Sequence, residues 1–560
     1  MQSIMIILLG IVGMLFGWFV YSKFLANYVF KLDPEFVTPA HELNDGVDFV
    51  PTNRYVLWGH HFTSVAGAAP IIGPAIAVYW GWLPAVIWVI FGTIFFAGIH
   101  DFGALWASSR NKGKSIGALS ESVLSRRSRV LFMVVTFLLL LMVNSVFGVV
   151  IAKAFVGTPE AVFPAWAAIV VALLIGQLIH RKFNLVVLSI GGVLALYLSV
   201  YAGSEIPLAL PTISGLGPQA AWIIILFVYA AIASMLPVWM LLQPRDFING
   251  MQLLVGLFLL YGAVLLFMPD ISAPAINANI VVNGPSVIPL LFVTIACGAV
   301  SGFHGIVASG TSSKQLDKEP DARFVGYLGA VGEGTLALIT IVTVSGVALA
   351  ATPEAWHDIY SEFGAAGAGS FISGGASLIN SGWGIPIGFA ESLLATMVVL
   401  FAGTTMDSGV RLQRYIIQEW GEIYDIPVLK RGVVATLIAV GGCLLLAFGA
   451  GDSSGTGGLV IWPLFGSTNQ ILAGMTLLVI SVMLIKLGRP AYPAIIPMLF
   501  VLAMSIMAGL TTLAQFFREG NYLLVVLDAI VLVTSLLVML EAGLVIARHR
   551  RAKTSLALTD

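Results

Sequence analysis

Ionisable side chains interrupt the long apolar segments of this 560-residue chain. A charge inside a bilayer costs at least about 2.5–3.5 kcal/mol on insertion scales, so each such residue needs a partner, water or a function. Their types would allow proton transfer, cation binding or metal binding. The positions are His60, His61, His100, Asp101, His304, Glu333, Glu391, Asp407 and Asp528.

His304 is the first candidate for carrying a proton. It lies in the middle of a glycine-rich apolar segment, residues 296–310, where a broken backbone would admit water. Histidine titrates near pH 6.5, so it could take up a proton outside the cell and release it inside. The alternative is a neutral histidine that is hydrogen-bonded within a helix bundle.

Sodium is the alternative coupling ion, because hard cations prefer oxygen ligands. Unwound carbonyl groups beside hydroxyl and carboxylate side chains would provide them. The hydroxyl groups could equally bond to the backbone of their own helix, and the carboxylate could reach interfacial water. The candidate ion-coupling residues are Ala66, Ser309, Thr311, Ser312 and Asp407.

A metal ion is a third possibility. His60, His61, His100 and Asp101 are suitable ligand types on segments adjacent in sequence. Their spacing matches no known metal motif, and pairing of His60 or His61 with Asp101 explains them as well. A bound metal is therefore kept only as an option.

Clusters of glycine and proline interrupt three apolar segments: 59–82, 234–247 and 296–316. Irregular backbone at membrane depth survives only where it is buried in protein or lines a polar cavity. Because proline removes an amide donor, the backbone around 66–74 is predicted to be unwound. The alternative for each cluster is a kinked helix packed closely through its glycines.

Such breaks also indicate where a substrate would bind. The free amides at the N-terminus of a half-helix favour a carboxylate. Trp239, beside the second cluster, could form a wall of the pocket or simply pack there. The predicted substrate-binding residues are Gly67, Ala68, Pro70, Pro237, Trp239 and His304.

The composition predicts an all-α polytopic membrane protein. Hydrophobic residues make up 59% of the chain and charged residues 10%, against about 25% charged in soluble domains. The net charge of −1 gives no reason to expect nucleic acid as a partner. About 20 apolar residues cross a bilayer, and fifteen segments qualify: 4–22, 57–80, 82–107, 128–156, 162–180, 184–202, 219–242, 249–268, 287–312, 324–351, 390–413, 431–450, 459–485, 491–514 and 521–547.

The basic residues predict the orientation of these spans. All Lys and Arg residues except Lys153 and Arg518 lie either in alternate connections between the spans or in the C-terminal tail. The positive-inside rule then places the N-terminus outside and the C-terminus in the cytoplasm of a bacterial inner membrane. Residues 352–389 form an outer connection that could hold a short interfacial helix or a re-entrant segment.

The positions of the interruptions predict an inverted repeat. The interrupted second and seventh spans are five helices apart, so they run in opposite directions, which is typical of the binding site of a secondary transporter. Within one integral membrane domain, 1–560, we therefore expect these parts: a first helix and cytoplasmic connector, 1–56; a transport core, 57–413, with halves 57–202 and 219–413; appended helices, 431–547; and a tail, 548–560.

Five stretches resemble the carbon starvation protein A family of peptide and pyruvate transporters: 59–84, 97–117, 236–247, 294–316 and 461–474. The most specific are GHHF and SGTSSKQL. The resemblance implies a leucine-transporter-like 5+5 core of the amino acid–polyamine–organocation superfamily. In that core, sodium binds between the first broken helix and the eighth core helix, taken here as 287–312. GTTMDSGVRLQR at 403–414 departs modestly from the family pattern.

Together these features predict a secondary active transporter rather than an enzyme. It would import small peptides, or pyruvate-like carboxylates, under carbon starvation by alternating access coupled to protons or sodium. The alternatives are a metal-containing membrane enzyme and a starvation sensor. The sequence leaves the oligomeric state open.

Overall fold

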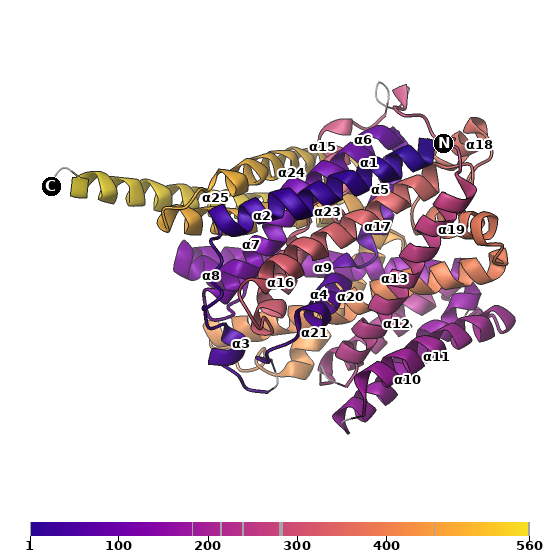
Figure 1. Ribbon diagram of the computed structural model, residues 1–560, viewed down its shortest axis with the longest axis horizontal. Coiled ribbons are helices and arrows are strands. Elements are labelled where there is room, and N and C mark those ends of the chain that lie inside the picture. Colours follow the sequence, from indigo (N-terminus) through magenta and orange to yellow (C-terminus); the bar gives the residue numbers. More distant parts are fainter. Residues whose placement is uncertain are drawn as a thin grey trace.

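The protein is helical throughout its described residues, with isolated β-bridges and no β-strand. The computed structural model describes all residues except 1, 47, 182, 213–214, 238–239, 279, 281–283, 453 and 558–560. The two termini lie at opposite ends of the bundle (Figure 1). The main helices are α1 (Gln2–Phe16), α4 (Arg54–Ala66), α5 (Ala69–Ala77), α6 (Trp82–Gly92), α7 (Gly98–Ser109), α8 (Ile116–Val123), α9 (Arg126–Gly157), α10 (Val162–His180), α11 (Leu185–Glu205), α12 (Pro218–Met235), α13 (Leu242–Phe267), α15 (Val287–Thr294), α16 (Gly302–Gly310), α17 (Leu328–Ser345), α18 (Pro353–Ile359), α19 (Ala368–Trp383), α20 (Ile387–Ile423), α21 (Gly432–Gly449), α23 (Trp462–Lys486), α24 (Tyr492–Arg518) and α25 (Tyr522–Ala557).

Within the described part of the chain, 13 helices are long and apolar enough to cross a membrane, and the bent pair α4–α5 brings the number to 14. The one remaining predicted span, 287–312, is divided into α15 and α16, each too short to cross alone. The prediction of a polytopic membrane protein is confirmed, but two of its spans are not continuous helices. Residues 352–389 contain the short helices α18 and α19.

The first break is narrower than the predicted stretch 66–74. Helix α4 ends at Ala66, α5 begins at Ala69, and their axes differ by 47°. Gly67 has a φ of 45°, a backbone conformation that side chains disfavour. Pro70 then falls in the first turn of α5, where no amide donor is needed.

The second break is the irregular stretch 295–301 between α15 and α16, as the cluster at 296–316 indicated. The two broken spans lie side by side and run in opposite directions. A Cβ on Gly73 would lie 2.4 Å from the carbonyl oxygen of Thr294, and the Nδ1 of His61 lies 2.8 Å from the Oγ of Ser312. The start of each span therefore faces the end of the other.

The prediction of a break in the seventh span is wrong. Helix α12 ends at Met235 and α13 begins at Leu242, so Pro237 lies in a connection between two helices. Pro244 lies in the first turn of α13, where its missing amide breaks no helical hydrogen bond. Trp239 lies outside the described residues.

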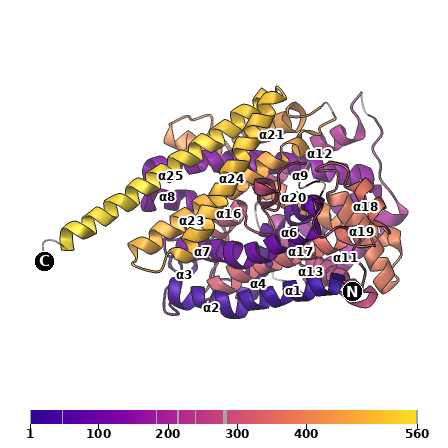
Figure 2. The same ribbon diagram turned by 90° about the horizontal axis from the view of Figure 1, so that it is seen from above.

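The helices form two groups. Helices α6, α7 and α17 pack on the broken spans, while α9, α12, α20 and α21 pack on one another. The hairpin α10–α11 lies at one edge (Figure 1) with a small apolar cluster shared with α12, α13 and α20. Helices α24 and α25 cover another side, and α25 projects past the bundle (Figure 2).

Two antiparallel broken spans, each followed by longer helices, are the arrangement expected of an inverted-repeat core. The second broken span starts at Val287, whereas the second half was expected to start at 219. We infer that one half runs from α4 to α13 with the α10–α11 hairpin inserted, and the other from α15 to α23.

The basic connections gather at one end of the molecule, called here the basic face. Arg110, after α7, forms an ion pair with Glu319, after α16. Arg129 at the start of α9 likewise pairs with Glu419 near the end of α20, and Lys486 at the end of α23 donates to the Val123 carbonyl. These connections lie together, as the charge pattern predicts.

Replacing Gly73 by Ala is expected to destabilise the contact between the broken spans. The new methyl group would meet a backbone carbonyl at 2.4 Å, and such overpacking costs about 1–3 kcal/mol. Thermal unfolding in detergent should show a lower midpoint. Gly441→Ala in α21 is the matched control, because its Cβ would meet nothing within 4 Å. Equal stability of the two variants would contradict the close contact.

Candidate functional site

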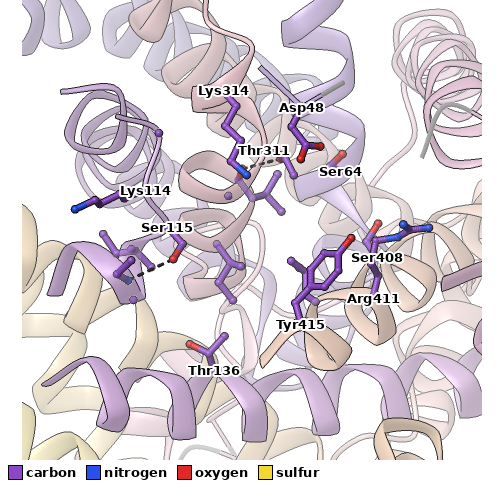
Figure 3. A pocket seen from close by; sticks show the side chains of 18 of the residues that line it. Asp48, Ser64, Lys114, Ser115, Thr136, Thr311, Lys314, Ser408, Arg411 and Tyr415 are labelled. Atoms are coloured by element: carbon purple, nitrogen blue, oxygen red, sulfur yellow. Dashed lines mark hydrogen bonds between the residues drawn. The ribbon is translucent and has the colours of Figure 1, made fainter. Parts of the chain in front are cut away.

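A cavity of about 590 Å³ opens at the basic face. Its walls come from α4, α8, α9, α13, α16 and α20. Figure 3 shows polar side chains around it, with Lys114 and Ser115 on the side opposite Arg411 and Tyr415. This inner cavity therefore joins the broken spans to the second group of helices.

A second cavity, of about 670 Å³, lies toward the other end of the same helices. On the α4–α5 span the inner cavity reaches Ser64, whereas this outer cavity begins at Ile72. Between them lies Gly67, where a Cβ would come within 2.9 Å of the Oγ1 of Thr405 and 3.8 Å of the Phe147 ring. The first break thus lies in the layer that separates the cavities.

The described residues among those predicted to bind substrate do not line either cavity. Gly67, Ala68 and Pro70 are buried in the separating layer. Pro237 lies in the connection after α12, and His304 is fully buried. Among the described predicted residues, only those of the first break lie at the junction where a solute would pass.

His304 lies between two buried carboxylates from neighbouring helices. Its Nδ1 is 2.9 Å from the Oδ2 of Asp101 on α7, and its Nε2 is 3.0 Å from the Oε2 of Glu333 on α17. The Nδ1 of His100 lies 2.7 Å from the other oxygen of Asp101. An imidazole placed between two carboxylates holds at least one proton that the three groups share. This cluster is called the His304 cluster.

The His304 cluster connects the helices packed around the broken spans. Asp101, His304 and Glu333 come from α7, α16 and α17, and His304 is only three residues beyond the irregular stretch 295–301. His61 on α4 contacts the end of the same span through Ser312. A change of protonation here would therefore act on the second break.

The predicted metal site is not formed by the described residues. His60 lines the inner cavity, whereas the adjacent His61 points to Ser312. Consecutive residues of a helix are about 100° apart around its axis, so their side chains diverge. His100 and Asp101 contact each other within the His304 cluster instead.

The predicted sodium ligands are also dispersed. Ser309 Oγ donates to the Gly305 carbonyl and Thr311 Oγ1 to the Val307 carbonyl, each one turn back on its own helix. Ser312 contacts His61. The helix that faces Gly67 is α20, through Thr405. The predicted ligands thus have other partners, and the sodium site stays a prediction.

Asp407 has a separate role from the one predicted. Its Oδ2 accepts hydrogen bonds from Arg245 on α13 and, at 2.7 Å, from the Tyr229 hydroxyl on α12. Both charged side chains are almost fully buried. This ion pair ties α20 to α12 and α13. No sequence pattern pointed to it, because Arg245 counted only toward the orientation.

The sequence also provided no reason to select Asp246, the next residue on α13. It is buried, lines the inner cavity, and its Oδ2 lies 3.7 Å from the Nδ1 of His60. Lys114 and Lys314 of the cavity were likewise interpreted only as orientation signals.

The known proteins that resemble this chain in sequence include several bacterial transporters. Peptide transporter CstA of Campylobacter jejuni is 31% identical, over 93% of this chain and 81% of its own. Peptide transporter CstA of Escherichia coli K12 is 30% identical, over 87% and 78%. The pyruvate/proton symporter BtsT of the same strain is 31% identical, over 84% and 76%.

Solved structures give weaker matches. A mutant of the manganese transporter of Eremococcus coleocola has a TM-score of 0.47 at 12% identity, covering 91% of this chain and 99% of its own. MhsT in complex with L-phenylalanine has a TM-score of 0.45 at 13% identity, covering 88% and 99%.

The family model described as carbon starvation protein CstA matches residues 2–351 and 344–508. These matches extend over most of the chain and include both broken spans and the His304 cluster. With the relatives named above, they identify the chain as a multi-pass membrane transporter rather than an enzyme. The chain belongs to the carbon starvation protein CstA family.

Proposed function

We propose that this protein imports a small carboxylate-bearing solute, a short peptide or a pyruvate-like acid, together with a proton across the bacterial inner membrane. Its basic face would lie in the cytoplasm, so that the inner cavity opens to that side. Import would serve the cell when carbon is scarce. The observation that carries the proposal is a cavity that ends at the first break, next to a buried, proton-holding cluster.

The inner cavity supports the solute part of the proposal. Its volume of about 590 Å³ lies in the range of small-molecule sites, about 300–1,000 Å³. Lys112, Lys114, Lys314 and Arg411 line it. These cations suit a carboxylate, which both kinds of solute carry.

The His304 cluster supports protons as the coupling ion. A histidine between two carboxylates can gain and lose a proton without leaving its place. The cluster lies beside the second break, so the loss of its proton would weaken the attachment of α16 to α7 and α17. Because this attachment would depend on the proton, the proton gradient would drive the alternating access.

Counterflow in proteoliposomes tests this function. Vesicles loaded with unlabelled pyruvate or dialanine should accumulate the same labelled solute several-fold above empty vesicles. An inward proton gradient should speed net uptake, and replacing sodium by choline should change nothing. If neither solute exchanges in the presence of both ion gradients, the proposed function is wrong.

A further inference from the structure

We propose that Asp246 forms a subsite for a cationic group of the transported solute, an ammonium, so that this residue distinguishes amino-terminal peptides from plain carboxylates. This inference rests on the proposed function and specifies the recognition within its cavity. Asp246 lies in the second turn of α13.

Asp246 is placed on the cavity by the packing of its helix. Four residues further along α13, Gly250 packs against Thr63 of α4: a Cβ there would come within 2.5 Å of the Thr63 Oγ1. Residues four apart share a face of a helix, so Asp246 faces α4 as well. It meets that helix at His60, which also lines the inner cavity.

The carboxylate of Asp246 is buried without a matching charged donor. Its side chain is 3% exposed, its Oδ1 has no hydrogen-bond partner, and its Oδ2 is 3.7 Å from His60 Nδ1, too far for a hydrogen bond. The neighbouring Ser64 hydroxyl is its one neutral hydrogen-bond partner among the described residues, and that hydroxyl also lies 2.8 Å from the His60 carbonyl on its own helix. Leaving a buried charged group unpaired is unfavourable. A donor that arrives in the cavity would relieve this, and a charged N–H donor would do so best.

The neighbouring arginine does not supply that donor. Arg245 is adjacent in sequence, but its Nη1 bonds Asp407 and the Tyr229 hydroxyl on other helices. The hydrogen bonds of Arg245 thus go to Asp407 and Tyr229, and none of them goes to Asp246.

Cations line the same cavity at other points. Arg411 on α20 lines it; its Nη2 donates to the carbonyls of Ala233 and Leu236, and its Nε has no hydrogen-bond partner. Lys114 and Lys314 line it as well. A solute with an ammonium and a carboxylate would therefore find a partner for each charge. A plain 2-oxo acid would leave Asp246 unpaired.

Replacing Asp246 by Asn tests the inference. The amide keeps the shape and removes the charge, so the KM for dialanine uptake should rise at least tenfold. Uptake of pyruvate and of N-acetyl-dialanine, which lack the ammonium, should stay within twofold or improve. Asp246→Glu should recover most of the dialanine affinity.

Asp425→Asn is the matched control, because Asp425 is an exposed carboxylate of the same face that pairs with Lys430. It should leave all three solutes unchanged. Thermal unfolding of each variant shows whether the protein is folded.

Three results would overturn the inference. Asp246→Asn could lower uptake of all three solutes equally, which indicates a structural role, or change none of them. Asp246→Asn could also abolish the proton or sodium dependence of pyruvate uptake, which would mean that Asp246 binds the coupling ion and not the ammonium of the solute. If the wild type carries pyruvate but not dialanine, the inference fails and the proposed function stands; if it carries neither, both fail.

Discussion

Replacing His304 by Gln is expected to reduce proton-driven accumulation of solute to simple equilibration. Glutamine has a similar reach but cannot bind or release a proton at physiological pH. Its amide could donate to Asp101 or to Glu333, yet its oxygen could not accept from either carboxylate once both are ionised. The variant would therefore attach α16 equally strongly at every pH, so that alternating access would continue without responding to the proton gradient.

The measurement separates coupling from loss of folding. Counterflow, which needs no net proton movement, should persist in His304→Gln, while uptake driven by an inward proton gradient should stop. His357→Gln on α18 is the control, since that histidine is exposed and far along the chain from the cluster. Proton-dependent uptake that is equally fast in His304→Gln would remove this residue from the mechanism.

Replacing Asp407 by Ala is expected to be the most destabilising single change considered. It leaves the guanidinium of Arg245 buried with no counter-charge, and removing one partner of a buried pair costs about 3–5 kcal/mol. Little folded protein should be recovered at 37 °C. Tyr229→Phe should cost less, about 0.5–1.5 kcal/mol, because it removes one hydrogen bond and no charge.

A double variant tests the reason for that loss. Arg245→Met with Asp407→Leu removes both charges and keeps apolar volume, so it should recover much of the thermal stability that Asp407→Ala loses. Transport by the double variant is a separate measurement. If Asp407→Ala unfolds at the same temperature as the wild type, the pair does not hold α20 to α12 and α13.

The membrane segments and the first break could be predicted because each depends on neighbouring residues. Apolar length defines a span, and Gly67 followed by Pro70 defines a break. The partner of that break could not be identified by counting spans, since the α10–α11 hairpin adds two helices to the first half. The break predicted at Pro237 was wrong for a related reason: in the sequence, a proline in the connection after a helix looks the same as a proline inside the helix.

The candidate site was recovered in part for the same reason. His304 could be selected from the sequence because an ionisable residue within an apolar segment is unusual whatever its neighbours in the fold. Its pairing with Asp101 and Glu333 depends on how three helices pack, and no local pattern encodes that. The proposed metal site was wrong at this step, because it joined suitable residue types that the fold turns toward different neighbours.

The layer between the two cavities also has an electrical consequence. On α9 the inner cavity ends at Thr136 and the outer cavity begins at Val150, a separation of about 20 Å along the helix. Water on both sides concentrates the membrane potential across this layer, where each net charge carried is worth about 2.3 kcal/mol per 100 mV. A pyruvate ion entering with one proton carries no net charge, whereas a zwitterionic peptide entering with one proton carries one. The same proton site would therefore let the membrane voltage drive peptide import and leave pyruvate import to the pH difference alone.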